Sequence, residues 1–271
     1  MVAWPGQTRL ARELASEAAR PHSWPGLGAV APESLTIILV PDQRRLDSLT
    51  RGRAPHWGAG LALPESRTVV LRADLADVRV TLRHELAHLA LHQRVPVRVP
   101  LWFDEGYAGW AAGEWERLGG LELNLALARG AVPDLASLDA ALRGPEPTVG
   151  AAYALAMSAV VELARRNPTG ALEPLFALLA AGEDFDAAVL RTTGLSPGRF
   201  EEVWRRSVRT RYTAVTWLVA GGGWAVLAFV VLWFGRWRRG RDAARRAALD
   251  EGWVVPDDPP EEAELDRDSK S

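Results

Sequence analysis

A run of 24 residues without a charged side chain, from Tyr212 to Gly235, divides this chain of 271 residues into unequal parts. As a helix rising about 1.5 Å per residue, the run would span roughly 36 Å, and a bilayer core is about 30 Å thick. Trp217 lies near one end and Trp233 near the other, where interfacial aromatic residues belong. We therefore predict one transmembrane helix over residues 212–235, with a buried core helix as the alternative.

The two flanks of this run indicate the domain organisation. Residues 1–211 have the length and composition of a globular domain, and residues 236–271 form a basic juxtamembrane segment followed by an acidic, proline-containing tail that we expect to be disordered. Six arginines after the run against five before it favour a cytoplasmic C-terminus and an extracytoplasmic globular domain. The first 24 residues show no apolar stretch typical of a signal peptide, which leaves a cytoplasmic globular domain as the alternative.

Composition excludes several classes of protein. With 48% hydrophobic and 24% charged residues the chain is expected to fold, and its formal net charge of -2 gives no reason to expect a nucleic-acid partner. The absence of cysteine excludes a disulfide framework, a thiol nucleophile and a cysteine-ligated metal site.

The hydrophobic pattern over residues 1–211 predicts a predominantly helical α+β domain, with a small N-terminal β-sheet followed by a helical half. Strands are expected at 35–40 and 68–71, and helices at 11–20, 43–49, 74–92 and 101–118. Residues 56–66 are interrupted by glycine and proline, so no strand is expected there.

The strongest chemical signal is His84-Glu85-Leu86-Ala87-His88, in the middle of a predicted helix. Two histidines four residues apart share one helical face, so both imidazoles can reach a single metal ion. Glu85 lies beside them, where a carboxylate can accept a proton from metal-bound water. This arrangement is typical of zinc hydrolases.

A hydrolytic zinc ion needs a third protein ligand and an open fourth position for water. A histidine six residues after His88 is missing, because that position is Arg94. His92 is one turn further along the same face, too far along the axis to share the ion, and is expected to pack or to support the site. Glu105 is the preferred third ligand, with its neighbour Asp104 as the alternative.

HELAH followed by Pro-Leu-Trp-Phe-Asp-Glu-Gly-Tyr-Ala resembles the gluzincin metallopeptidases, specifically the peptidase MA-like family with its HExxH and W-x-x-EG-x-A motifs. The resemblance covers roughly residues 35–206. It implies a zincin-like catalytic domain in which His84, His88 and Glu105 bind one zinc ion and Glu85 is the general base. Tyr153 falls where related enzymes place a helix tyrosine over the site. It is either a hydrogen-bond donor to the oxyanion or a half-buried core aromatic.

One departure from the family bears on the substrate. Related aminopeptidases have a Gly-x-Met-Glu-Asn element before the zinc helix, and its glutamate binds the substrate amine. Here residues 58–66 read GAGLALPES, with Glu65 as the nearest acid, so an endopeptidase acting on extended peptide or unfolded protein is favoured. The strand at 68–71 is expected to present its backbone to that peptide.

Two other functional interpretations stay open. The first is a zincin-fold binding or scaffold module that keeps its zinc without turnover, although such a module has no need for Glu85. The second is an accidental HELAH pattern, which leaves the segment around Glu105 unexplained.

Residues 119–150 are a candidate lid over the cleft. Glu114 and Glu116 are expected to be solvated surface residues.

Overall fold

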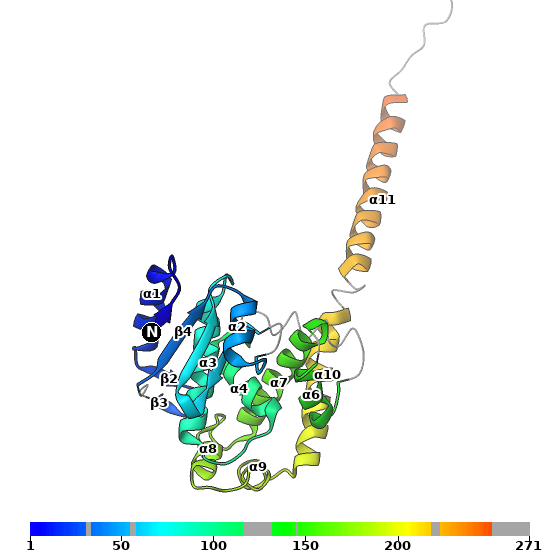
Figure 1. Ribbon diagram of the computed structural model, residues 1–271. Coiled ribbons are helices and arrows are strands. Elements are labelled where there is room, and N and C mark those ends of the chain that lie inside the picture. The colour runs from blue at the N-terminus through cyan, green and yellow to red at the C-terminus, as the bar shows by residue number, and fades with distance from the viewer. Residues whose placement is uncertain (31–33, 55–57, 116–131, 145, 218–222, 251–271) are drawn as a thin grey trace, which may run out of the picture. The chain divides into compact units, whose positions relative to one another are not determined.

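The computed structural model describes residues 1–30, 34–54, 58–115, 132–144, 146–217 and 223–250 (Figure 1). The chain divides into two compact units, Met1–Thr216 and Trp217–Ser271. The acidic tail from residue 251, Glu116, and much of the candidate lid (residues 119–131 and 145) lie outside the described residues.

A four-stranded sheet in the order β1-β4-β6-β5 forms the N-terminal part of the first unit. β1 (Val2–Ala3), β4 (Thr36–Val40) and β6 (Thr68–Arg72) run parallel, and the edge strand β5 (Gly60–Leu63) pairs antiparallel with β6. A separate hairpin joins β2 (His22–Trp24) to β3 (Gly28–Val30). β4 and β6 agree with the two predicted strands.

The first helices alternate with these strands along the chain, and the others follow β6. They are α1 (Thr8–Ala18), α2 (Gln43–Thr50), the 3-10 turn η1 (Pro64–Ser66), α3 (Val78–Arg94), α4 (Leu101–Ala112), α6 (Leu135–Leu142), α7 (Glu146–Arg166), α8 (Glu173–Ala180), α9 (Phe185–Thr193), α10 (Pro197–Trp217) and α11 (Gly223–Asp250). The predicted predominantly helical α+β architecture with a small N-terminal sheet is confirmed. The helix predicted over 101–118 ends early, because Gly113 adopts a φ of 82° and terminates α4 there.

The transmembrane helix expected over residues 212–235 is not found in the described part of the chain. α10 reaches Trp217, α11 begins at Gly223, and the residues between them are outside the description. Neither of these helices, nor any other that the structure describes, is long and apolar enough to cross a bilayer.

In the interior, α3 packs against the sheet, α4 packs against α3, and α7 packs on α4. An aromatic cluster forms the centre of the helical half and includes the fully buried Phe103 and Tyr107 of α4. The Tyr107 hydroxyl donates a hydrogen bond to the Pro25 carbonyl at 2.9 Å, which ties α4 to the β2–β3 hairpin. The start of α4 is fixed by the Asp139 carboxylate, which accepts a hydrogen bond from the Trp102 N–H at 2.6 Å.

Gly106 permits the close packing of α4 on α7. A Cβ at this position would lie 2.5 Å from the Ala156 carbonyl oxygen of α7, so any larger residue forces the helices apart. Because Gly106 follows Glu105 directly, this contact also determines how near α7 lies to the candidate site.

Candidate metal centre

His84 and His88 project from one face of α3, as the four-residue spacing predicts. Their Nε2 atoms are 3.2 Å apart, and both side chains are 12% exposed. Two imidazole nitrogens this close in a partly buried place can share one ion.

Glu105 on α4 completes a triangle with these nitrogens. Its Oε2 lies 3.5 Å from Nε2 of His84 and 3.6 Å from Nε2 of His88. These three residues are also one of the His/carboxylate groups whose ligand atoms all lie within 4.8 Å of one another.

The triangle has the dimensions of three corners of a zinc tetrahedron. With ligand distances of about 2.0–2.1 Å, neighbouring ligands of a tetrahedral zinc ion are about 3.3–3.4 Å apart. The sides of the triangle, 3.2, 3.5 and 3.6 Å, bracket this value. The residues present therefore fit a zinc ion with the fourth corner left for another ligand.

The outer nitrogens of both histidines are held by carboxylates. Nδ1 of His88 lies 2.7 Å from Asp104, and Nδ1 of His84 lies 3.1 Å from Glu114. A carboxylate on the outer nitrogen orients a metal-binding imidazole and makes its inner nitrogen a better ligand. Asp104, the alternative third ligand in the sequence analysis, thus lies on the outer side of His88 and away from the triangle.

The expectation that Glu114 is a solvated surface residue is wrong. It lies just after Gly113, and the turn made by this glycine directs the carboxylate back to His84. Sequence pattern alone could only have indicated that each metal-binding histidine needs an outer-nitrogen partner, since which acid supplies it depends on how α4 crosses α3.

His92 supports the site through Asp104. Its Nε2 lies 2.9 Å from the second oxygen of that carboxylate, so Asp104 bridges two histidines of α3. His88, His92 and Asp104 also form a second His/carboxylate group within 4.8 Å, on the outer side of His88. The supporting position expected for His92 agrees with this geometry.

The charges of the cluster show that it suits a cation. Burial lowers the pKa of His84, but hydrogen bonds to Glu105 and Glu114 outweigh this effect and raise it to about 10. Burial disfavours ionisation of Glu105, yet the two imidazoles hold its pKa well below the usual range. In the metal-free protein, bound protons therefore supply the positive charge that a divalent ion would otherwise bring.

The pKa of Glu85 shifts in the opposite direction to that of Glu105, because at Glu85 the effect of burial outweighs that of the neighbouring charges. The side chain is buried beneath the edge strand, and burial raises its pKa. Its carboxylate accepts a hydrogen bond from the Ala62 N–H of β5. At Gly60 of the same strand a Cβ would lie only 3.1 Å from Glu85 Oε1 and 2.9 Å from Leu71, so glycine lets β5 approach α3 this closely.

Tyr153 lies on α7 beside the triangle. Its ring centroid is 6.2 Å from that of His84, and its hydroxyl is hydrogen-bonded to Glu105. Burial and the neighbouring carboxylates raise the pKa of this phenol well above its ordinary value, which keeps the hydroxyl protonated and able to donate. Its proximity agrees with the sequence analysis, and its catalytic role stays a prediction.

A cleft of about 370 Å³ gives access to the cluster. One wall is the edge strand β5 and the other carries His84, Glu85, Glu105 and Tyr153.

Two expectations about the strands are corrected here. The strand at 68–71 is β6, an interior strand paired on both sides, so β5 has the backbone edge that faces the cleft. β5 was not expected because its GLAL sequence has a glycine and no β-branched residue.

Comparison with known proteins adds one match. The family model described as the Peptidase MA superfamily matches residues 26–210, which include the whole cluster and both helices that carry it. No curated protein and no solved structure matches the chain.

Proposed function

The chain belongs to the peptidase MA superfamily, and from this premise we propose that it is a zinc-dependent peptidase that cleaves peptide bonds within extended chains. The observation that carries the proposal is the triangle of His84, His88 and Glu105 beside the buried carboxylate of Glu85. One zinc ion per chain would be held by His84, His88 and Glu105.

When bound, zinc supplies a Lewis acid that lowers the pKa of water towards 7 and polarises a carbonyl oxygen. Glu85 takes a proton from the attacking water, whose oxygen forms the new bond to the carbonyl carbon. The same carboxyl group then passes this proton to the leaving amine as the C–N bond breaks. Burial suits Glu85 to both steps, because its raised pKa lies closer to neutral pH than that of an exposed carboxyl.

Tyr153 and β5 supply the remaining interactions. The Tyr153 hydroxyl donates a hydrogen bond to the carbonyl oxygen as negative charge develops on it. β5 pairs with an extended substrate through its backbone N–H and C=O groups. Glu65, the acid that follows this strand in the sequence, is exposed on η1 and does not line the cleft, which supports internal cleavage over capture of a free amine.

We also propose that residues 212–235 attach the enzyme to a lipid bilayer, with the C-terminus cytoplasmic and the peptidase unit extracytoplasmic. The support is the apolar surface of α11, where Trp224 is 71%, Phe229 69% and Leu232 67% exposed. Exposed apolar surface on this scale marks a partner or a membrane. The arginines that follow, from Arg236 onwards, suit the cytoplasmic side.

The test measures zinc content and cleavage of N-acetylated, C-amidated peptides by the full-length protein and by Glu85→Gln. We expect one zinc per chain in both proteins and cleavage about 10²–10⁴-fold slower in the variant, because only the proton acceptor is lost. Glu65→Gln, the same change at an exposed acid, is the matched control and should cleave normally.

Two outcomes would overturn the proposal. Zinc in both proteins with cleavage in neither would identify a zinc-binding scaffold module. Absence of zinc from the wild-type protein would remove the metal site itself.

A further inference from the structure

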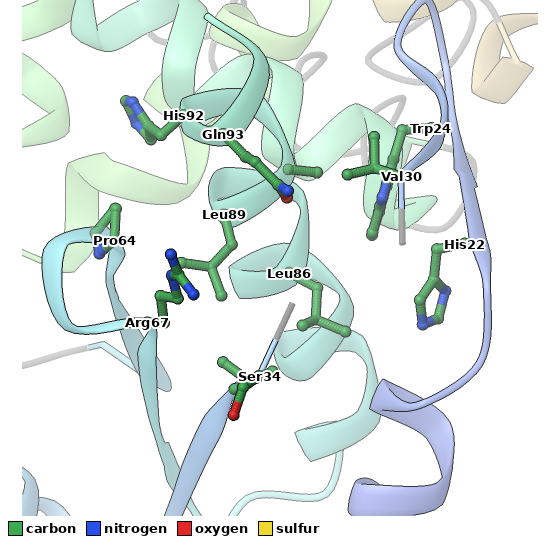
Figure 2. A pocket seen from close by; sticks show the side chains of 12 residues that line it. His22, Trp24, Val30, Ser34, Pro64, Arg67, Leu86, Leu89, His92 and Gln93 are labelled. Atoms are coloured by element: carbon green, nitrogen blue, oxygen red, sulfur yellow. The ribbon is translucent and has the colours of Figure 1, made fainter. Parts of the chain in front are cut away.

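A second pocket, of about 240 Å³, lies beyond one end of the cleft (Figure 2). Its walls come from the β2–β3 hairpin, the turn η1 and the residues that follow it, and the side of α3 turned away from the metal centre. In Figure 2, Leu89 of α3 extends toward Arg67, whereas Leu86 lies on the side of the helix nearer His22. Pro64 and His92 line both this pocket and the cleft, so the two spaces are adjacent.

The edge strand leads from the general base to this pocket. Gly60, at the start of β5, lies against Thr81 and Glu85 of α3, and Pro64 follows the end of β5 at the pocket. Glu85 accepts a hydrogen bond from Ala62, two residues before Pro64. At about 3.3 Å per residue, two residues of extended chain span about 7 Å. A peptide paired with β5 thus reaches the pocket two or three residues from the bond beside Glu85.

The chemistry of the pocket selects for an apolar group. Trp24, Val30 and Leu86 are each at most 5% exposed and form its floor. Arg67 is the one side chain with a full charge among the described residues that line it, and none of those residues is acidic. The described part of the lining therefore offers no counter-charge to a cationic side chain.

The size of the pocket points to a single side chain. Its 240 Å³ lies below the range of about 300–1,000 Å³ typical of sites that enclose a whole small-molecule ligand. Pro64 and His92 line both the pocket and the cleft, and both are exposed. The pocket is therefore only partly separated from the cleft.

We propose that this pocket is a specificity subsite for a bulky apolar side chain of the substrate, aromatic or long aliphatic, two or three residues from the cleaved bond. The inference rests on the proposed peptidase function and deepens it by naming the substrate class.

Two readouts test this inference. The first is the cleavage profile of the full-length, zinc-loaded protein on a library of blocked peptides. The second is the affinity of fluorescent peptides for the Glu85→Gln variant, measured by anisotropy, which needs no turnover. Phenylalanine or leucine at the position two or three residues from the cleaved bond should improve kcat/KM and Kd about tenfold or more over glycine. The side of the cleaved bond on which this preference falls gives the direction of the bound chain.

Pocket-filling variants locate the preference. Leu89→Trp should abolish the preference for phenylalanine while peptides with glycine at that position are still cleaved and bound. Val30→Phe fills the pocket from the opposite wall and should act in the same way, which separates filling from any disturbance of α3. Leu49→Trp, the same change at a 45%-exposed leucine of α2, is the matched control and should keep the preference.

The failures are distinguishable. Cleavage by the wild-type protein without apolar preference at these positions, or a preference that survives both filling variants, overturns the subsite and leaves the peptidase standing. Selective binding without any wild-type cleavage overturns the peptidase and leaves the pocket as a site for an apolar side chain.

Discussion

Helices α3 and α11 depart from the usual distribution of polar and apolar residues in opposite directions. α3 holds two imidazoles and a carboxylate in a partly or fully buried place, where each is paired with groups from neighbouring helices or the edge strand. α11 exposes large apolar side chains, Trp224 and Phe229 among them. Burying polar groups and exposing apolar ones both cost free energy. We propose that each departure reflects what the helix meets outside its own chain: a cation for α3 and lipid for α11.

The largest effect on zinc binding and cleavage is expected from removing Glu105 of α4, the proposed third zinc ligand. Glu105→Ala leaves two imidazoles without the third corner of the triangle. Stoichiometric zinc should be lost, and cleavage should fall by more than the about 10–100-fold typical of changes outside the ligand set. Metal analysis after gel filtration, with Glu65→Ala as the exposed control, checks this. Full zinc content and full activity in Glu105→Ala would show that α4 contributes no ligand.

Smaller losses of zinc affinity should follow when only the carboxylates on the Nδ1 atoms of the two histidines are changed. Asp104→Asn and Glu114→Gln keep the size of the side chain but remove the negative charge on Nδ1. Zinc affinity, measured by competition with a chelator, should fall about 10–100-fold in each. Asp104→Asn should have the greater effect, because Asp104 contacts both His88 and His92. Asp74→Asn, an exposed ion-pair partner of Arg72, should leave the affinity unchanged.

In the metal-free protein, the contribution of His84 to stability should decrease as the pH rises. The pKa of His84 rises from 6.5 to about 10 on folding of the metal-free protein, so its stabilising contribution is complete below pH 6.5 and is lost towards pH 10. The Tm in chelator should therefore fall over this range, and His84→Gln should flatten the decline. A metal-free Tm that is constant or rises between pH 6.5 and 10 would contradict the assignment.

The smallest effect on cleavage is expected from changes in α11. Phe229→Asp should leave hydrolysis of soluble peptides unchanged, because α11 belongs to a separate unit. Flotation of the full-length protein with lipid vesicles should fall about 10²-fold, since aspartate costs about 2.5–3.5 kcal/mol inside a bilayer. Leu190→Asp, at a 48%-exposed leucine of α9, is the matched control. Equal flotation of Phe229→Asp and wild type would argue against attachment through α11.

Much of the arrangement could be predicted where the determinants are local. The four-residue spacing of His84 and His88 places them on one face of any regular helix, and runs of apolar residues identify β4 and β6. β5 was missed because its position depends on pairing with β6 and on the contact of Gly60 with α3. Glu114 was misjudged for the same reason, since its partner lies 30 residues away in the sequence.

The amino-acid sequence by itself determined the α+β class. It also placed the candidate metal-binding pair and the neighbouring carboxylate together on one helix, because helical periodicity relates residues within a few positions of one another. Only the tertiary structure decided that Glu105 faces the pair while Asp104 faces outward, that β5 is the open edge, and that a second pocket lies beyond Pro64. These features depend on how closely packed elements approach. That distance is set by residues such as Gly60 and Gly106, because a Cβ atom at either position would collide with the neighbouring element.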